Sequence, residues 1–399
     1  MYLDYTPEQQ ALRTELRGYF AKLGDELGPF SGPGEGGPQY RKVVRRLGKD
    51  GWLGIGWPTE FGGQGRTAME QFIFFDEVQR AGAPFPFVTI NTVGPTIMRF
   101  GSDEQKKTYL PGILAGEINF AIGYTEPEAG TDLASLKTRA VRDGDEYVIN
   151  GNKVFTSGAD DADYVWLACR TDPDAPKHKG ISLVIVPTSS PGFKVTPIVT
   201  VGGTRTTATY YDDVRVPVDN CVGGENHGWK MITTQLNHER VGLGALAGTC
   251  FEMWDATFEW AKSTEAAASH TAPEGNAVVR MADVPWVKAD LARTWAKLEA
   301  VKLLNWRMVE QIGSGEPKPA DSSAVKVYAT ETLIDVYRTL LGIVGPLGIV
   351  REGSPEAVFR GRMEKAARAA QINTFGGGVN DVQREIIAAA GLGMKRGAR

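Results

Sequence analysis

The run Tyr-Thr-Glu-Pro-Glu-Ala-Gly-Thr-Asp, residues 124–132, ends a strand-like segment and turns through Pro127 and Gly130. A second run, Lys-Val-Phe-Thr-Ser-Gly, follows at 153–158. Small and hydroxylated residues at such a turn leave backbone N–H groups and threonine hydroxyls available to an anionic or carbonyl-rich ligand. The phenylalanine of the second run offers a flat ring for stacking, with a serine hydroxyl beside it. Taken on its own, a Thr-Glu-Pro run is more often an ordinary turn, so from these residues alone a cofactor cradle is the less common interpretation.

The composition is that of a globular chain with sizeable hydrophobic cores. Of its 399 residues, 42% are hydrophobic and 23% charged, so two or three domains are expected. The net charge of −4 shows no bias toward nucleic acid or an anionic membrane. The three cysteines and four histidines lack the spacing of a disulfide framework or a metal site. Because no apolar run approaches the roughly 20 residues of a membrane span and no signal-peptide pattern is present, we expect a cytoplasmic protein with no membrane partner.

Helical spacing dominates the first part of the chain. Thr6-Pro7-Glu8-Gln9 is a capping-box opening, and apolar residues at helical spacing follow it. Further helices, separated by loops rich in Gly and Pro, are predicted over 40–49, 68–81, 95–100 and 103–115. Residues 1–118 are therefore predicted to form an N-terminal helical domain.

Strand-like runs rich in Val, Ile, Tyr and Phe begin at Phe120. Asp143-Gly144 and Asn150-Gly151 are both two-residue hairpin signals. Further strands are predicted over 164–168, 181–186, 193–198 and 209–216. Residues 119–225 are predicted to form a small antiparallel β-barrel or sandwich domain that contains the cradle.

Helical spacing returns after the Gly223-Gly224 turn. Helices are predicted over 229–262, 284–312, 322–341, 355–372 and 380–390, and a loop rich in Ala, Ser and Thr over 263–276. Residues 226–399 are predicted to form a C-terminal helical domain. The order of helices, then strands, then helices indicates the α+β class rather than alternating parallel units.

The two runs at 124–132 and 153–158 resemble the flavin-binding segments of the acyl-CoA dehydrogenase family, and the resemblance extends over essentially the whole chain. It implies FAD as the cofactor and a fold with an N-terminal helical domain, a middle β domain and a C-terminal four-helix bundle. Motif by motif, it assigns the following residues to the cofactor: Tyr124 and Thr125 at the flavin ring edge, Gly130 and Thr131 at the ribityl chain and phosphate, and Phe155 and Ser157 over and beside the ring. In the C-terminal loop Val379 and Asp381 replace the family's Thr and Gln at further cofactor positions.

The family's reaction requires a carboxylate base for the α proton of a thioester, while the β hydride goes to the flavin. In most members the base is a glutamate in the C-terminal loop, where this chain has Gly377. A minority, including isovaleryl-CoA and long-chain acyl-CoA dehydrogenases, has the glutamate on the first helix of the C-terminal domain, which corresponds here to Glu239 in Leu236-Asn237-His238-Glu239-Arg240. Glu239 is therefore the predicted catalytic base, and the alternative is a surface glutamate paired with a nearby arginine. By the same resemblance, Gly377 contributes a backbone N–H to the thioester oxygen.

Two motifs with which a neighbouring subunit completes the flavin site in homotetrameric relatives are not intact. No Arg-x-x-Phe-Gly follows Lys262, and Gly-Ile-Val-Gly-Pro-Leu-Gly at 342–348 replaces Gln-x-x-Gly-Gly-x-Gly. The missing arginine would pair with the FAD pyrophosphate. A different chain is expected to supply these groups.

This pattern is similar to that of the α2β2 acyl-CoA dehydrogenases of actinobacterial steroid degradation, which act on cholesterol side-chain CoA thioesters. It implies a heterotetramer with a second, unlike acyl-CoA dehydrogenase subunit, a bulky or branched acyl-CoA substrate, and electron-transfer flavoprotein as acceptor. The side-chain-free loop Gly376-Gly377-Gly378 leaves room for a bulky acyl group. A branched-chain or bile-acid thioester would fit the same pattern.

Two other functions remain open from the sequence. The chain could be a non-catalytic scaffold that completes a partner's flavin site, although a scaffold is expected to keep the donating motifs and lose the cradle. It could also be an acyl-CoA oxidase, which uses oxygen as acceptor, although the chain length does not suggest the additional domain of that class.

Overall fold

The computed structural model describes residues 4–30, 36–235, 247–263, 280–315 and 317–395. The chain forms two compact units, each described here by itself. One unit contains most of the N-terminal helices and the β-sheet. The other contains the C-terminal helices together with Phe75–Ala81 and Val201–Gly203.

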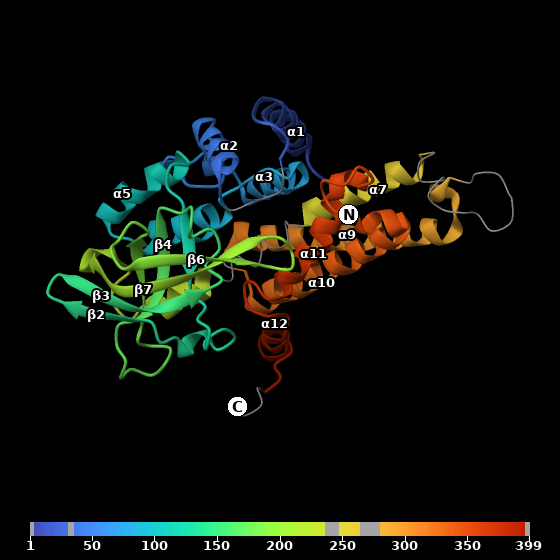
Figure 1. Ribbon diagram of the computed structural model, residues 1–399. Helices are drawn as coiled ribbons and strands as arrows, with labels where there is room; N and C mark the ends of the chain where they lie inside the picture. Colours follow the sequence, from blue (N-terminus) through green and yellow to red (C-terminus); the bar gives the residue numbers. More distant parts are fainter. Residues whose placement is uncertain (1–3, 31–35, 236–246, 264–279, 316, 396–399) are drawn as a thin grey trace. The chain divides into compact units, whose positions relative to one another are not determined.

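The predicted N-terminal helices are present, with ends shifted by a few residues (Figure 1). They are α1 (Pro7–Leu27), α2 (Pro38–Lys49), α3 (Ala68–Ala81), α4 (Gly94–Phe100) and α5 (Asp103–Leu114). The capping box at the start of α1 is confirmed, because Thr6 Oγ1 accepts a bond from the Gln9 N–H and Gln9 Oε1 accepts one from the Thr6 N–H.

A π-helical turn, Thr89–Val93, precedes α4 and was not predicted from the sequence. Pro95 has no N–H to bond the carbonyl four residues earlier, which favours an irregular turn at this point. The Trp57 ring lies against Gly94, where a Cβ would come within 2.2 Å of it, and Trp57 Nε1 donates to the Ile90 carbonyl at 3.1 Å. Only glycine at position 94 permits this close approach.

The middle segment forms one eight-stranded mixed sheet in the order β6-β7-β3-β2-β4-β5-β8, with β1 paired to β4 (Figure 1). The strands are β1 (Phe120–Gly123), β2 (Arg139–Asp143), β3 (Glu146–Val154), β4 (Tyr164–Arg170), β5 (Ile181–Pro187), β6 (Phe193–Val199), β7 (Arg205–Pro217) and β8 (Cys221–Val222). Most pairings are antiparallel as predicted, but β1 and β2 both run parallel to β4. The sheet thus brings the end of β1, where the cradle turn begins, beside β4.

One of the two predicted hairpins is wrong. The Asp143-Gly144 signal does connect β2 to β3, with Asp143 paired to Glu146. Asn150-Gly151 instead lies inside β3, where the register with β7 shifts between Ile149 and Gly151. The extra residue of this irregularity lies in β7, where Asp213 has φ +49°. Gly151 has φ +147°, and a Cβ there would come within 2.6 Å of the Thr138 side chain, so the glycine permits a close approach inside the sheet and does not form a turn.

The described C-terminal helices are α7 (Ala247–Ala261), α9 (Pro285–Ser314), α10 (Pro319–Val344), α11 (Arg362–Ala369) and α12 (Asn380–Ile386). The predicted helix over 229–262 is seen at 228–235 and again in α7. The predicted start of a helix at 355 is wrong: Phe359 and Arg360 have φ of +54° and +55°, and regular helix begins at Arg362. Almost all of the predicted loop 263–276 lies outside the described residues.

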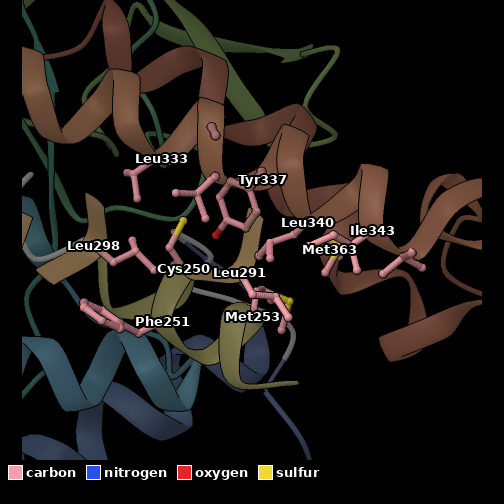
Figure 2. Close-up of a cluster of buried hydrophobic side chains, with 14 of the residues drawn as sticks. Cys250, Phe251, Met253, Leu291, Leu298, Leu333, Tyr337, Leu340, Ile343 and Met363 are labelled. Atoms are coloured by element: carbon pink, nitrogen blue, oxygen red, sulfur yellow. The ribbon is translucent and has the colours of Figure 1, made fainter. Parts of the chain in front are cut away.

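Side chains from α7, α9 and α10 meet in the core of this unit, which Figure 2 shows for Cys250, Leu298, Leu333, Tyr337 and Leu340. One described helix, α10 with the turn after it (Pro319–Ile349), has a length and mean hydropathy compatible with a membrane span. The same length and hydropathy occur in the central helix of a soluble bundle. The buried side chains along α10 give it that central place in this core.

The Leu340→Ala variant tests this core. Leu340 is fully buried, so we expect the loss of its side chain to lower the free energy of unfolding by about 2–5 kcal/mol. Leu303→Ala is the control, because Leu303 is 39% exposed on α9 and its removal leaves no buried cavity. Thermal unfolding of both variants measures the difference. Equal melting temperatures would contradict the described packing.

Candidate functional site

The turn that follows β1 is held by a buried ion pair. Lys153, from β3, is fully buried, and its Nζ donates to Glu126 Oε1 at 2.8 Å and to the Tyr124 carbonyl at 3.0 Å. Within the turn, the backbones of Glu126 and Ala129 exchange bonds of 3.2 and 3.1 Å. A single ammonium therefore fixes the start of the turn to the strand that leads into the second cradle run.

Glu126 has further donors that keep it ionised inside the protein. Its Oε2 accepts the Lys137 N–H at 2.6 Å, and its Oε1 accepts the Thr138 N–H at 2.8 Å. Burial alone raises the pKa of this carboxyl, but the Lys153 ammonium and these donors outweigh it and hold the pKa below its ordinary value. Glu126 thus connects both ends of the segment 126–138 to β3.

Phe155 has an unusual backbone and an exposed ring. Its φ is +61°, a left-handed conformation that is rare for a bulky residue, and its side chain is 59% exposed. The adjoining Thr156 N–H donates to the Thr207 carbonyl at 2.9 Å, which holds the strained peptide against β7. Backbone strain combined with an exposed aromatic ring is typical of a ligand-binding position. Ser157, next to the ring, shares a 2.9 Å hydrogen bond with Thr206.

The small residues of the turn remain accessible. Gly130 and Thr131 are exposed and Thr125 is half-buried. Within the residues that the structure describes, the hydroxyls of Thr125 and Thr131 have no protein hydrogen-bond partner. Free hydroxyls beside an exposed ring suit a cofactor with a flat ring and a polar, phosphorylated chain, so these residues fit FAD.

Tyr124 differs from its neighbours because its hydroxyl is used within the protein. It donates to Gln235 Oε1 and accepts from Trp166 Nε1 at 3.1 Å, and Gln235 in turn donates to Thr96 Oγ1 at 2.7 Å. Any contact of Tyr124 with the cofactor ring edge therefore comes from other atoms of the residue. The network ties helical residues 228–235 to the cradle turn. The predicted base, Glu239, lies outside the described residues.

In the C-terminal unit, the predicted site loop connects a 3₁₀ turn, Ala370–Thr374, to α12. Gly377 and Gly378 have φ of +66° and +91°, which favours glycine at both positions. Val379 is the N-cap of α12, and Asp381 is exposed in the first turn of that helix. The Asp381 carboxylate complements the helix dipole but is a poor ligand for an anionic cofactor.

The stretch that replaces the second donating motif ends α10 and packs on its own unit. The helix stops at Val344, Gly345 follows with φ +71°, and a 3₁₀ turn runs over Gly345–Ile349. Leu347 packs against the hydrophobic core. The place of the first donating motif falls largely in 264–279, outside the described residues.

Sequence reasoning missed the roles of Glu126, Lys153 and Gln235. For Lys153 a signal existed, because its position in β3 has the same parity as the buried Tyr147 and Ile149, which predicts an inward-facing side chain. Lys153 pairs with Glu126, 27 residues earlier, and Gln235 bonds Tyr124. Both are tertiary contacts that a local sequence pattern does not predict.

Comparison with known proteins matches all three parts of the chain to one enzyme family. Models of the N-terminal, middle and C-terminal domains of acyl-CoA dehydrogenases match residues 6–117, 121–214 and 226–392. Acyl-CoA dehydrogenase FadE26 of Mycobacterium tuberculosis is 51% identical over 410 residues, covering 100% of both chains.

Two solved structures are similar over the same length. A chain of the steroid ACAD Tcur3481-Tcur3483 superposes with a TM-score of 0.93 at 57% identity, covering 100% of both chains. A chain of the ChsE4-ChsE5 complex from Mycobacterium tuberculosis superposes with a TM-score of 0.90 at 50% identity, also with 100% coverage of both.

The Lys153→Met variant tests the ion pair of the turn. It leaves the Glu126 carboxylate buried without its cation, so we expect a loss of about 3–5 kcal/mol in stability and weaker retention of a bound cofactor. Lys137→Met is the matched control, because Lys137 forms an exposed ion pair with Glu128 in the same segment and its loss should change little. Thermal unfolding and cofactor content of the purified variants measure both effects. A Lys153→Met protein as stable as the control would show that the pair does not hold the turn.

Proposed function

This chain belongs to the acyl-CoA dehydrogenase family of FAD-dependent enzymes, and we propose that it oxidises the α,β bond of a bulky acyl-CoA thioester with Glu239 as the base. We further propose that its domains are 1–118, 119–225 and 226–399. The observation on which the assignment of the base depends is Gly377, which removes the carboxylate from the loop position that most members use.

The cradle residues provide the cofactor side of the site. FAD, when bound, supplies the acceptor for the β hydride. Phe155 and Ser157 would contact its ring system, and Thr125, Gly130 and Thr131 its more polar chain. The Glu126–Lys153 pair holds this surface in shape without needing to touch the cofactor itself.

Proton abstraction needs a carboxylate, and the C-terminal loop does not offer a suitable one. Positions 376–378 are glycines, and the nearest acid along the loop, Asp381, is exposed in α12. Glu239 follows Gln235 by four residues, and Gln235 is tied to the cradle turn through Tyr124. We therefore propose that this glutamate, four residues after the anchor in the sequence, serves the same active site.

The glycine loop has a second use in this proposal. The α C–H of a thioester becomes acidic enough only if the oxygen that gains negative charge is met by preorganised donors. The Gly377 N–H is the donor that we assign to the thioester oxygen. Because position 377 has no side chain, the peptide can lie close to the substrate.

Three observations support a bulky, polycyclic acyl group. A Cβ built on Gly376 meets no atom closer than 4.0 Å, so the loop leaves space on its open side. Phe375 beside it exposes 63% of its side chain, which offers an apolar surface. The relatives with similar full-length structures include a steroid ACAD. We therefore propose a steroid side-chain CoA thioester as substrate.

The flavin site is proposed to be shared with an unlike subunit in an α2β2 assembly. The altered donating motifs leave the FAD pyrophosphate without its arginine from a second copy of this chain. The two similar structures are described by pairs of chain names, Tcur3481-Tcur3483 and ChsE4-ChsE5. We also propose that electron-transfer flavoprotein accepts the electrons. The enzyme would act in cholesterol catabolism, in the cytoplasm.

Glu239→Gln in the co-expressed pair tests the base. The variant keeps the shape of the side chain but cannot accept the proton, so we expect FAD to remain bound while dehydrogenation falls by about 10²–10⁴-fold. The substrate is a steroid with a three-carbon side-chain carboxylate as its CoA thioester. Glu259→Gln is the control, because Glu259 is a surface carboxylate of α7 paired with Lys262.

The outcomes separate the competing functions. Full activity in Glu239→Gln would contradict the assignment and favour a scaffold subunit whose partner performs the chemistry. Oxygen consumption equal to substrate turnover in the unmodified pair would instead indicate an oxidase.

A further inference from the structure

Lys326 on α10 is a fully buried lysine that the reaction described above does not use. Its Nζ donates to the Thr374 carbonyl at 3.1 Å, the Gly378 carbonyl at 3.0 Å and Asn380 Oδ1 at 2.7 Å. Burying an ammonium group is costly unless its protons are bonded, and here oxygen acceptors surround it. Every one of these contacts lies within the C-terminal unit.

The Lys326 ammonium bonds the backbone on both sides of the glycine loop. Thr374 precedes the loop and Gly378 ends it, so the two carbonyls bonded to Lys326 bracket residues 375–377. Three consecutive glycines have little preference for one backbone conformation, and Gly377 is in the left-handed region with φ +66°. The bonds from Lys326 therefore restrict the loop to one backbone conformation.

A second buried side chain holds the same loop. Gln383 of α12 donates from Nε2 to the carbonyls of Gly377 and Gly378, both at 3.3 Å. Its Oε1 accepts the Ser323 hydroxyl from α10 at 2.8 Å, which fixes the amide orientation. The loop is thus bonded from α10 and α12 together.

An outer layer fixes the partner of Lys326. Asn380 Nδ2 donates to Thr330 Oγ1 at 3.2 Å and to Glu331 Oε1 at 3.0 Å. Arg384 donates to both Glu331 oxygens at 2.6 and 2.8 Å. The Glu331 carboxylate is thus linked to the Lys326 ammonium through Asn380. The hydrogen bonds continue from the exposed Arg384 to the loop.

We propose that Lys326 is a positioning residue for dehydrogenation, acting through Gly377 by clamping the loop that presents its N–H to the thioester oxygen. The inference depends on the role of Gly377 in the proposed function. Gln383 supports the same geometry from the other side. Lys326 itself does not contact substrate or cofactor in this proposal.

Lys326→Met in the co-expressed, FAD-loaded complex tests the proposal. Displacement of a catalytic donor by a fraction of an ångström to one ångström should lower kcat by about 10–100-fold, with KM changed by no more than about 3-fold. The second readout is the infrared carbonyl band of the bound α,β-unsaturated steroid acyl-CoA. Loss of the aligned N–H should shift this band to higher frequency, an effect that a purely structural lysine would not produce.

Two further variants make the test decisive. Lys297→Met is the control, because Lys297 forms a half-exposed ion pair with Asp335 between α9 and α10, and it should match the unmodified complex in kcat and in the carbonyl band. Gln383→Met removes the second clamp without burying or unburying a charge, so it decides the question if Lys326→Met fails to fold. We expect it to shift the band in the same direction.

An unshifted band with normal kcat in folded Lys326→Met, or in Gln383→Met if the first does not fold, would overturn the proposal. Failure of the proposed function would look different, because the unmodified complex would then not dehydrogenate the steroid thioester at all. The band is measured without turnover, so it reports on the loop independently of Glu239.

Discussion

The buried pair of Lys153 and Glu126 is the interaction on which the turn after β1, the proposed cofactor surface, depends. One ammonium joins the end of β1 to β3, and one carboxylate gathers the N–H groups of Lys137 and Thr138. With the turn held from inside, its outer face presents small residues, the side chains of Thr125 and Thr131 and the strained Phe155 ring. Burying an ion pair contributes little net stability compared with an apolar pair, so its value here is the single conformation that it enforces.

In the C-terminal unit, too, buried polar side chains hold a loop in one conformation. Its glycine loop has no side chains with which to hold itself, and Lys326 and Gln383 supply the missing constraint from α10 and α12. In both units a buried lysine lies under a turn of the proposed site and donates to backbone carbonyl and side-chain oxygens. Rigid support beneath a small, open surface lets backbone groups approach a ligand closely while the surrounding residues stay fixed.

Much of the fold could be predicted from the sequence because its signals are local. The Thr6–Gln9 capping box, the Asp143-Gly144 hairpin and the change of period at Phe120 each depend on neighbours within a few residues. The errors have tertiary causes. Asn150-Gly151 has the composition of a turn but lies inside β3, opposite an extra residue of β7 where Asp213 has left-handed backbone. The helix expected at 355 starts late because Phe359 and Arg360 adopt left-handed backbone. For the proposed site, the motifs predicted two segments and a loop that stay predictions, whereas the burial of Lys153 and Lys326 and the engagement of the Tyr124 hydroxyl required the folded chain.

In our proposal this chain keeps the receiving half of a flavin site and relies on an unlike chain for the donating half. Titration of FAD into the apoprotein, alone and with the unlike subunit added, tests it most directly. Charge-assisted bonds to the pyrophosphate from the second chain should tighten FAD binding by about 100-fold relative to the chain alone. Equally tight, stoichiometric FAD binding by this chain in the absence of any partner would contradict the account.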